Sequence, residues 1–69
     1  MKLSARNTIK GTVKKLVVGA VNAEVTLEVA PGVEVVSIIS KASAENLGLA
    51  EGSEAYAVIK ASNVMLALE

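Results

Sequence analysis

The sequence contains no cysteine, no histidine, no tryptophan and no phenylalanine, and its only aromatic residue is Tyr56. Without cysteine there are no disulfides and no thiolate metal sites, and without histidine the commonest neutral metal ligand is missing. No serine sits in a nucleophile-elbow motif, so the usual nucleophilic catalysis is excluded as well. A single aromatic residue cannot build the stacking platforms of single-strand nucleic-acid binders. The composition therefore predicts a protein that is not an enzyme and has no direct ligands for a metal cation.

An excess of charge of one sign and long apolar runs are also missing. Seven Lys and Arg residues balance seven Asp and Glu residues, whereas a general nucleic-acid binder needs a clustered basic surface. Lys14 and Lys15 are consecutive, and on a strand they would point to opposite faces rather than form a patch. No apolar run approaches the ~20 residues of a membrane helix, and the N-terminus lacks a signal-peptide core. We therefore expect a cytoplasmic protein with no nucleic-acid or membrane partner.

Apolar residues, by contrast, are abundant, at 52% of a chain of 69 residues. So short a chain rarely gains more than roughly 3–5 kcal/mol from its own core, and disulfides and structural metals are excluded here. Exposed apolar patches are normally small in monomers. We therefore expect the surplus apolar groups to face another subunit of a homo-oligomer. The alternative is a monomer with an unusually apolar surface.

Alternating apolar and polar residues predict a mainly β protein. The longest alternation runs over residues 20–29, and further strands are expected at residues 9–17, 33–40, 53–60 and 63–68. Gly11 is expected at a bend or at a close approach of two backbones. Pro31-Gly32 predicts a type II turn, in a hairpin loop somewhat longer than this dipeptide, because two-residue hairpins prefer the primed turns.

One short helix is expected over residues 40–48. Ser40 suits the N-cap and Gly48 suits the left-handed position after the helix, although about two turns cannot stand without packing. The helix would lie between the third and fourth strands. This order predicts a five-stranded OB-like Greek-key barrel that occupies residues 1–69 as a single domain.

Two stretches near the ends of the chain each combine small residues with one fixed positive charge. They are Ser4-Ala5-Arg6-Asn7 and residues 58–65, the second of which contains Lys60-Ala61-Ser62. A tetrahedral oxyanion only accepts hydrogen bonds, and Arg6 offers it a planar donor fork while Lys60 offers a point charge. The serines add hydroxyl donors, and the alanines let an anion approach the backbone N–H groups. The alternative is an N-terminal extension and a hairpin turn that carry ordinary surface charges.

Six segments, in order along the chain, resemble the molbindins, small cytoplasmic molybdate-binding proteins made of a single Mop domain of the TOBE and OB-like family. The segments are residues 4–11, 19–25, 36–40, 46–49, 51–60 and 64–67. The resemblance implies an OB-like Mop fold over residues 1–69 and a homohexamer built as a trimer of dimers. It also implies molybdate or tungstate bound at subunit interfaces, and no organic cofactor is expected.

The same resemblance implies which residues hold the anion. Ser4, Arg6 and Lys60 match the family's interfacial oxyanion site, and Ala5 would contribute its backbone. Where the family often has a serine after the lysine, this chain has Ala61, so one hydroxyl donor is lost unless Ser62 or a backbone N–H replaces it. We expect Arg6 and Lys60 to come from two different chains, because a buried dianion must be fully hydrogen-bonded and its charge offset.

The resemblance also implies a second oxyanion site, nearer the symmetry axis, which would draw on one turn and one strand. The residues are Gly19, Ala20, Val21, Asn22, Ser37 and Ser40.

The function expected from these observations is binding of molybdate or tungstate for storage or homeostasis. The alternative is an oligomerising or anion-sensing regulatory module in which binding is secondary. A store should bind many equivalents per oligomer, whereas a sensor should need a partner domain.

Overall fold

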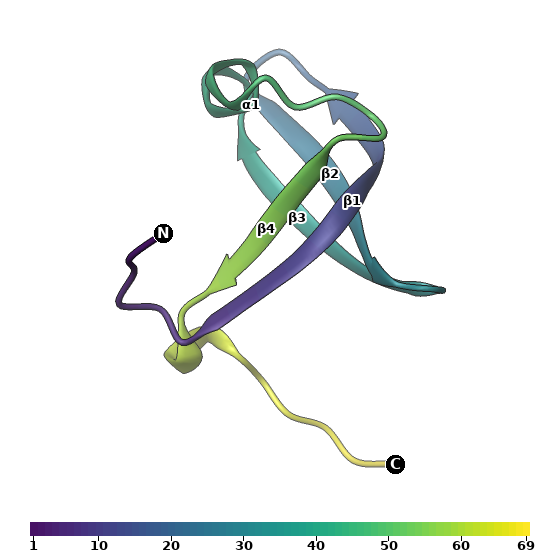
Figure 1. Ribbon diagram of the computed structural model, residues 1–69. Helices are drawn as coiled ribbons and strands as arrows, with labels where there is room; N and C mark the ends of the chain where they lie inside the picture. Colours follow the sequence, from purple (N-terminus) through teal and green to yellow (C-terminus); the bar gives the residue numbers. More distant parts are fainter.

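The computed structural model describes residues 1–69 and consists of four antiparallel strands, one short α-helix and one 3₁₀ turn (Figure 1). The elements are β1 (Asn7–Val18), β2 (Asn22–Ala30), β3 (Val33–Ser40), α1 (Lys41–Leu47), β4 (Glu54–Ile59) and the 3₁₀ helix η1 (Ala61–Asn63). The strands form a single sheet in the order β3-β2-β1-β4. The sheet curls strongly, so that β4 lies across from β3 and the whole resembles half of a barrel (Figure 1).

The alternation of β2 places one face of this strand in the core, as the sequence predicts. Ala23, Val25 and Leu27 are buried, whereas Glu24 between them is exposed. Val13 of β1 packs with Val25 and Leu27 to form the centre of the core. Only 5 of the 69 residues are buried, so most of the large apolar side chains remain at the surface of the single chain.

The helix α1 has the predicted caps. The Ser40 hydroxyl accepts a hydrogen bond of 3.0 Å from the Ser43 backbone N–H, and Gly48 adopts a left-handed φ of 64°. These partners satisfy groups that the helix itself leaves free. None of the helices has the length and apolar character needed to cross a membrane.

The turn between β2 and β3 is tighter than the sequence-based expectation. Gly32 has a φ of 75°, as the third position of a type II turn requires. Ala30 pairs with Val33, however, so the loop is Pro31-Gly32 alone and the expectation of a longer loop is wrong. The register shifts between Glu28 and Ala30. A bulge of this kind increases the local twist, which lets an unprimed turn connect the two strands.

The predicted fifth strand over residues 63–68 is absent, and this prediction is wrong for the single chain. After β4 the chain enters η1, in which the Asn63 N–H donates to the Lys60 carbonyl at 2.8 Å and the Val64 N–H donates to the Ala61 carbonyl at 3.2 Å. The remaining residues lead away from the sheet without regular structure (Figure 1). A strand needs a paired edge, and η1 directs the chain away from its own β4. The result is a half-barrel rather than a closed five-stranded barrel, with the helix between the third and fourth strands as predicted.

Candidate functional site

The pairing of β1 with β4 brings the two predicted motifs to the same end of the sheet. The strands are antiparallel, and the register begins with Asn7 opposite Ile59. Ser4-Ala5-Arg6 precedes Asn7, and Lys60-Ala61-Ser62 follows Ile59. Asn7 and Ile59 are 52 residues apart in sequence. The two motifs that adjoin them therefore leave the sheet at the same end within one chain.

A side-chain hydrogen bond holds this end of the sheet together. The Asn7 Nδ2 group donates to the Ile59 carbonyl at 3.2 Å, and Asn7 is half-buried. The bond ties the residue after Arg6 to the residue before Lys60, so Asn7 positions both motifs. Asn7 lies in the stretch Ser4-Ala5-Arg6-Asn7 that the sequence singles out, but the sequence assigns it no role, because its pairing with Ile59 is not visible there.

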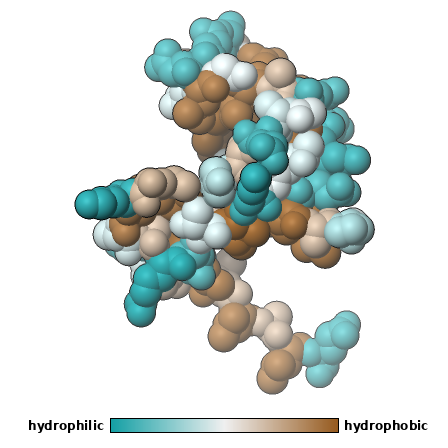
Figure 2. All heavy atoms as spheres, viewed as in Figure 1, coloured by the Kyte–Doolittle hydropathy of each residue, from teal (hydrophilic) through white to brown (hydrophobic).

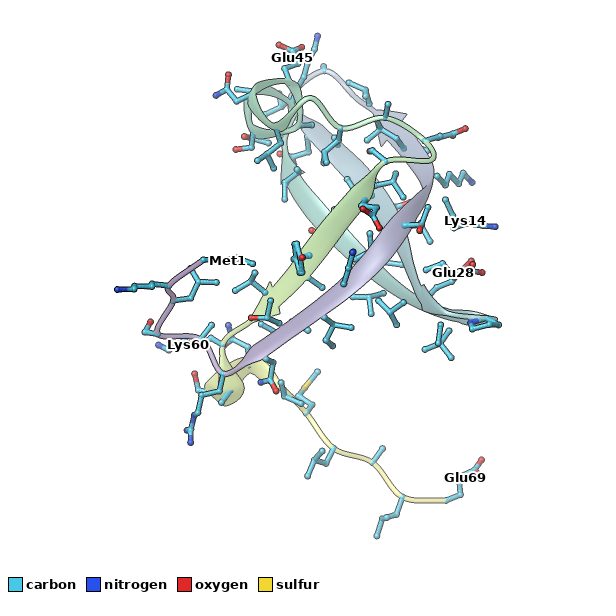
Figure 3. The ribbon with its side chains drawn as sticks, viewed as in Figure 1. Met1, Lys14, Glu28, Glu45, Lys60 and Glu69 are labelled. Carbon is cyan, nitrogen blue, oxygen red and sulfur yellow. The ribbon has the colours of Figure 1, made fainter.

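The positive charges of Arg6 and Lys60 have no carboxylate partner in the chain. The two ion pairs of the structure join Lys10 to Glu54 at 3.2 Å and Lys14 to Glu28 at 3.9 Å. The hydrogen bond to Glu54 raises the pKa of the Lys10 ammonium above its ordinary value of 10.5. Arg6 and Lys60 are exposed and are free to interact with an anion. Figure 3 shows Lys60 where β4 ends, beside the start of β1.

The η1 turn adds donors to the same place. The backbone N–H groups of Ala61 and Ser62 have no acceptor within the chain, because the η1 hydrogen bonds start from Asn63 and Val64. Unpaired N–H groups of this kind at a helix start are ordinary donors for an anion or for water. Ala61 therefore removes a hydroxyl from the site but leaves a free backbone donor, next to the exposed Ser62.

The residues predicted for a second oxyanion site lie away from the first site, around the opposite end of β1. The structure brings only some of them together. Residues 19–21 connect β1 to β2, and the Gly19 N–H donates to the carbonyl of Asn22, the first residue of β2, at 2.8 Å. Asn22 pairs with Ser40 across the sheet. The Ser40 hydroxyl is already engaged, because it caps α1 and donates to the Ser43 hydroxyl at 2.8 Å.

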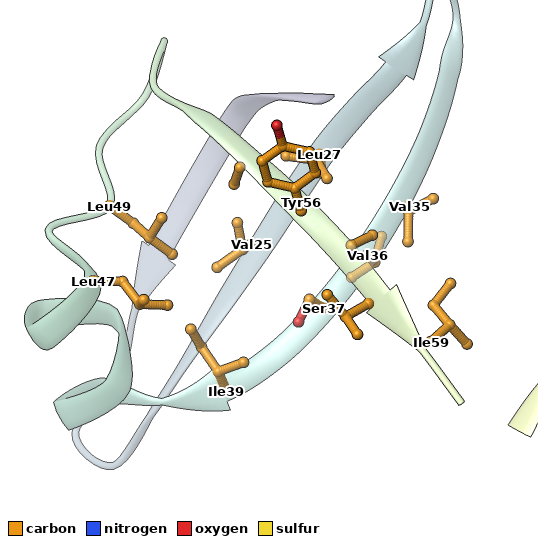
Figure 4. A pocket seen from close by; sticks show the side chains of 13 residues that line it. Val25, Leu27, Val35, Val36, Ser37, Ile39, Leu47, Leu49, Tyr56 and Ile59 are labelled. Carbon is orange, nitrogen blue, oxygen red and sulfur yellow. The ribbon is translucent and has the colours of Figure 1, made fainter. Parts of the chain in front are cut away.

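Ser37 does not join this second set. It pairs with Val25 in the middle of the β2–β3 ladder and lines a groove on the concave face of the sheet. The groove has a volume of about 510 Å³, and 12 of its 13 lining residues are hydrophobic (Figure 4). An apolar groove cannot solvate a dianion, so it is not an oxyanion site.

No group of three or more carboxylate, imidazole or thiol side chains lies close enough together to hold a metal ion. The features that can act on a ligand are therefore the unpaired cations and donors at the start of β1 and the end of β4. They suit a small anion that accepts hydrogen bonds.

Comparisons with known proteins describe what this chain is similar to. The TOBE domain matches residues 3–66. Molybdenum-pterin-binding protein 3 of Clostridium pasteurianum is 53% identical over 66 residues, which cover 96% of this chain and 97% of that protein. The probable molybdenum-pterin-binding protein of Haemophilus influenzae is 45% identical over 69 residues, which cover 100% of both chains. The molybdenum transport protein ModE of Azotobacter vinelandii is 49% identical over 69 residues, but these make up only 26% of ModE.

Solved structures match the fold as well. MopII from Clostridium pasteurianum superimposes with a TM-score of 0.90 at 49% identity, covering 97% of this chain and 100% of that chain. The cytoplasmic molybdate-binding protein ModG, in a form with molybdate bound, superimposes with a TM-score of 0.89 at 54% identity. It covers 94% of this chain and 46% of that chain. The half-barrel and its long terminal segments are thus shared with experimentally determined chains.

Proposed function

Because this chain belongs to the TOBE-domain family, and within it to the molybdenum-pterin-binding (Mop) proteins, we propose that it binds molybdate or tungstate and does not catalyse a reaction. The observation that carries the proposal is the arrangement of Arg6 and Lys60. Both cations flank the same end of the β1–β4 ladder, and neither is neutralised by a carboxylate.

The chemistry of this end suits a tetrahedral dianion. Arg6 can donate from a planar fork, Lys60 contributes a second positive charge, and the hydroxyls of Ser4 and Ser62 add neutral donors. Ala5 and Ala61 contribute backbone N–H groups with little steric hindrance. Every hydrogen bond to a dianion has a charged acceptor and is roughly twice as strong as a neutral one, and the two cations in addition offset the charge of the anion.

A second copy of the chain would strengthen such a site. Arg6 and Lys60 are exposed, and charge pairs exposed to water contribute little because the solvent screens them. Covering this end of the sheet with another subunit lowers the local dielectric and strengthens each electrostatic contact. The sequence-based hypothesis assigned Arg6 and Lys60 to different chains, whereas the β1–β4 register already collects both motifs in one chain. The partner's proposed role is therefore to exclude water and add donors, within a homohexamer arranged as a trimer of dimers.

The biological role that we propose is storage or homeostasis of the oxyanion in the cytoplasm by a single domain over residues 1–69. One solved relative, ModG, is described as a cytoplasmic molybdate-binding protein, which supports the cytoplasmic location and molybdate as the ligand.

Calorimetric titration with molybdate tests the site, with sulfate as the competing anion. The Arg6→Ala/Lys60→Ala variant should lose at least tenfold in affinity, because a hydrogen bond to a charged group contributes about 1.5–3 kcal/mol. The matched control is Lys15→Ala, which removes an exposed, unpaired lysine elsewhere on β1. The control should bind as the parent protein does. Full molybdate binding by the double variant would show that the site is wrong.

A regulatory module is the second candidate function. It is favoured by the similarity to ModE, in which the matching region is 26% of a longer protein. Native mass spectrometry with and without molybdate separates the two functions. A store should appear as one discrete oligomer that gains several molybdates and no sulfate. An oligomer that ignores molybdate would contradict storage and leave a module whose role is to oligomerise.

A further inference from the structure

The end of the sheet that holds Arg6 and Lys60 carries a third unpaired cation, Lys2. This lysine is exposed and takes part in neither of the two ion pairs of the structure. Lys2 comes four positions before Arg6, so the Cα atoms of the two residues are at most about 14 Å apart, whatever path the chain takes. Lys2 therefore belongs to the same end of the molecule as the candidate oxyanion site.

Carboxylates are missing from this end of the molecule. Residues 1–23 and 55–68 contain no Asp or Glu. Glu54 begins β4, about 20 Å of extended chain before Lys60, and already pairs with Lys10. Figure 3 shows three further carboxylates well away from Lys60, those of Glu28, Glu45 and Glu69. The positive charge at this end is therefore not compensated locally, although the whole chain has a net charge of zero.

Three cations exceed what one dianion neutralises. Arg6 and Lys60 offset the charge of a molybdate ion, and their N–H groups together with the hydroxyls of Ser4 and Ser62 suit its oxygens. Lys2 precedes Ser4 by two residues and leaves one positive charge over. Figure 2 shows hydrophilic residues of the N-terminal segment projecting from the body of the molecule. A charge in this position acts on an anion at a distance rather than by contact.

We propose that Lys2 draws the oxyanion to the site without contacting it, so that it raises the association rate and leaves the dissociation rate unchanged. Uncompensated charge around a site raises the local concentration of an oppositely charged ligand and its association rate. A charge at the rim of a site changes the association rate and its salt dependence, whereas a charge paired within the site changes the dissociation rate. The inference rests on the proposed function, because it requires an anion bound beside Arg6 and Lys60.

The size of the effect follows from distance and screening. In water, a unit charge about 14 Å from a dianion changes the local concentration of the anion about twofold at ~10 mM salt, where the Debye length is ~30 Å. Reversing the charge doubles the change and makes the effect about fourfold. At ~1 M salt the Debye length is ~3 Å, so the effect disappears.

Calorimetric titration with molybdate at low and high sodium chloride, ~10 mM and ~1 M, tests the proposal. We expect Lys2→Glu to bind about fourfold more weakly than the parent protein at low salt and equally well at high salt. Lys2→Arg keeps the charge and should bind as the parent protein does in both conditions.

The matched control is Lys41→Glu, which makes the same change in net charge at another exposed lysine that has no ion pair. Lys41 begins α1, and its N–H donates to the carbonyl of Val21 beyond the far end of β1 (Figure 1). The control should bind molybdate as the parent protein does at both salt concentrations.

Each contrary result has a distinct meaning. A loss of equal size at both salt concentrations would show that Lys2 touches the anion. Unchanged affinity of Lys2→Glu at low salt would show that its charge does not reach the site, and an equal loss in Lys41→Glu would show that net charge alone matters. Any of these overturns the proposal. A parent protein that does not bind molybdate contradicts the proposed function instead, so the two failures are distinguishable.

The rate of release separates capture of the anion from its retention. Quenched-flow release of radioactive molybdate into excess unlabelled molybdate at low salt gives the dissociation rate, which divided by the dissociation constant gives the association rate. Lys2→Glu should release the anion at the parent's rate. Arg6→Ala should release it at least tenfold faster, because Arg6 holds the anion by charged hydrogen bonds. If faster release accounts for the whole loss of affinity in Lys2→Glu, the capture role is wrong.

Discussion

Gly11 shows how a single residue sets how closely two strands of the sheet approach each other. A Cβ atom added at Gly11 would lie 2.6 Å from the Glu28 carbonyl oxygen and 2.8 Å from Leu27 Cγ. This confirms the close backbone approach expected from the sequence. β1 therefore passes nearer to β2 here than any other residue type allows, in the strand that pairs with both β2 and β4.

The Gly11→Ala variant should be destabilised by about 1–3 kcal/mol, the usual cost of forcing extra volume into a packed contact. Gly19→Ala is the control, because its added Cβ would come no closer than 3.1 Å to the Asn22 carbonyl oxygen, and it should cost less. Urea unfolding followed by circular dichroism measures both. Equal stability of Gly11→Ala and the parent would mean that β1 can move away from β2 without penalty.

Asn7 acts on the candidate site through position rather than through contact with the anion. Its side-chain bond to the Ile59 carbonyl is the tie between the residues that flank Arg6 and Lys60. We expect Asn7→Ala to lower molybdate affinity severalfold, because the two cations lose their fixed relative placement. The measurement is calorimetric titration, with Asn46→Ala on the exposed face of α1 as the control. An Asn7→Ala protein that binds with parental affinity would contradict the positioning role.

At the scale of elements, α1 depends on its cap because it has only seven residues. A helix so short gains its stability from capping and packing rather than from propensity. Its buried face is the single residue Ala44, so the cap at Ser40 carries much of the remaining stabilisation.

Ser40→Ala should therefore destabilise the protein by about 1 kcal/mol, the typical cost of losing an N-cap. Ser43→Ala is the matched control, because it removes only the hydroxyl that accepts from Ser40 and leaves the capped N–H in place. Thermal unfolding of both variants should show the larger shift for Ser40→Ala. The reverse order would mean that the hydroxyl pair, and not the cap, stabilises the helix.

At the scale of the whole molecule, the single chain has a very small hydrophobic core. Only Val13, Val25 and Leu27 form the buried cluster, while large apolar residues on β1, β3 and β4 and in the C-terminal segment stay exposed. A surface this apolar is typical of a subunit rather than of a soluble monomer. Stability should then come largely from association.

The thermal midpoint of the parent protein should accordingly rise with protein concentration, since association stabilises the folded state by mass action. Molybdate should raise the midpoint further, because a ligand at 100 times its dissociation constant adds about 2.7 kcal/mol to the free energy of unfolding. Scanning calorimetry over a range of protein concentrations, with and without molybdate, measures both effects. A midpoint independent of protein concentration would indicate a folded monomer, and an equal shift with sulfate would contradict selective binding.

The sequence by itself determined the local elements of this protein. The alternation of residues 20–29 specifies β2, Ser40 and Gly48 specify the ends of α1, and Gly32 specifies a type II turn. Each depends on neighbours in the chain, through side-chain period, capping or allowed φ, and such effects are visible in a linear pattern. The family resemblance also pointed to the relatives that the comparisons found.

Only the tertiary structure decided how the distant parts meet. The register of Asn7 with Ile59 places Arg6 and Lys60 at one end of one sheet, and no short-range pattern encodes a pairing across 52 positions. Residues 63–68 are predicted as a strand from their largely apolar sequence, yet a strand forms only where an edge is free to pair with it. The η1 turn takes this segment away from the chain's own edge. Whether this segment pairs therefore depends on tertiary geometry, which residue periodicity does not contain.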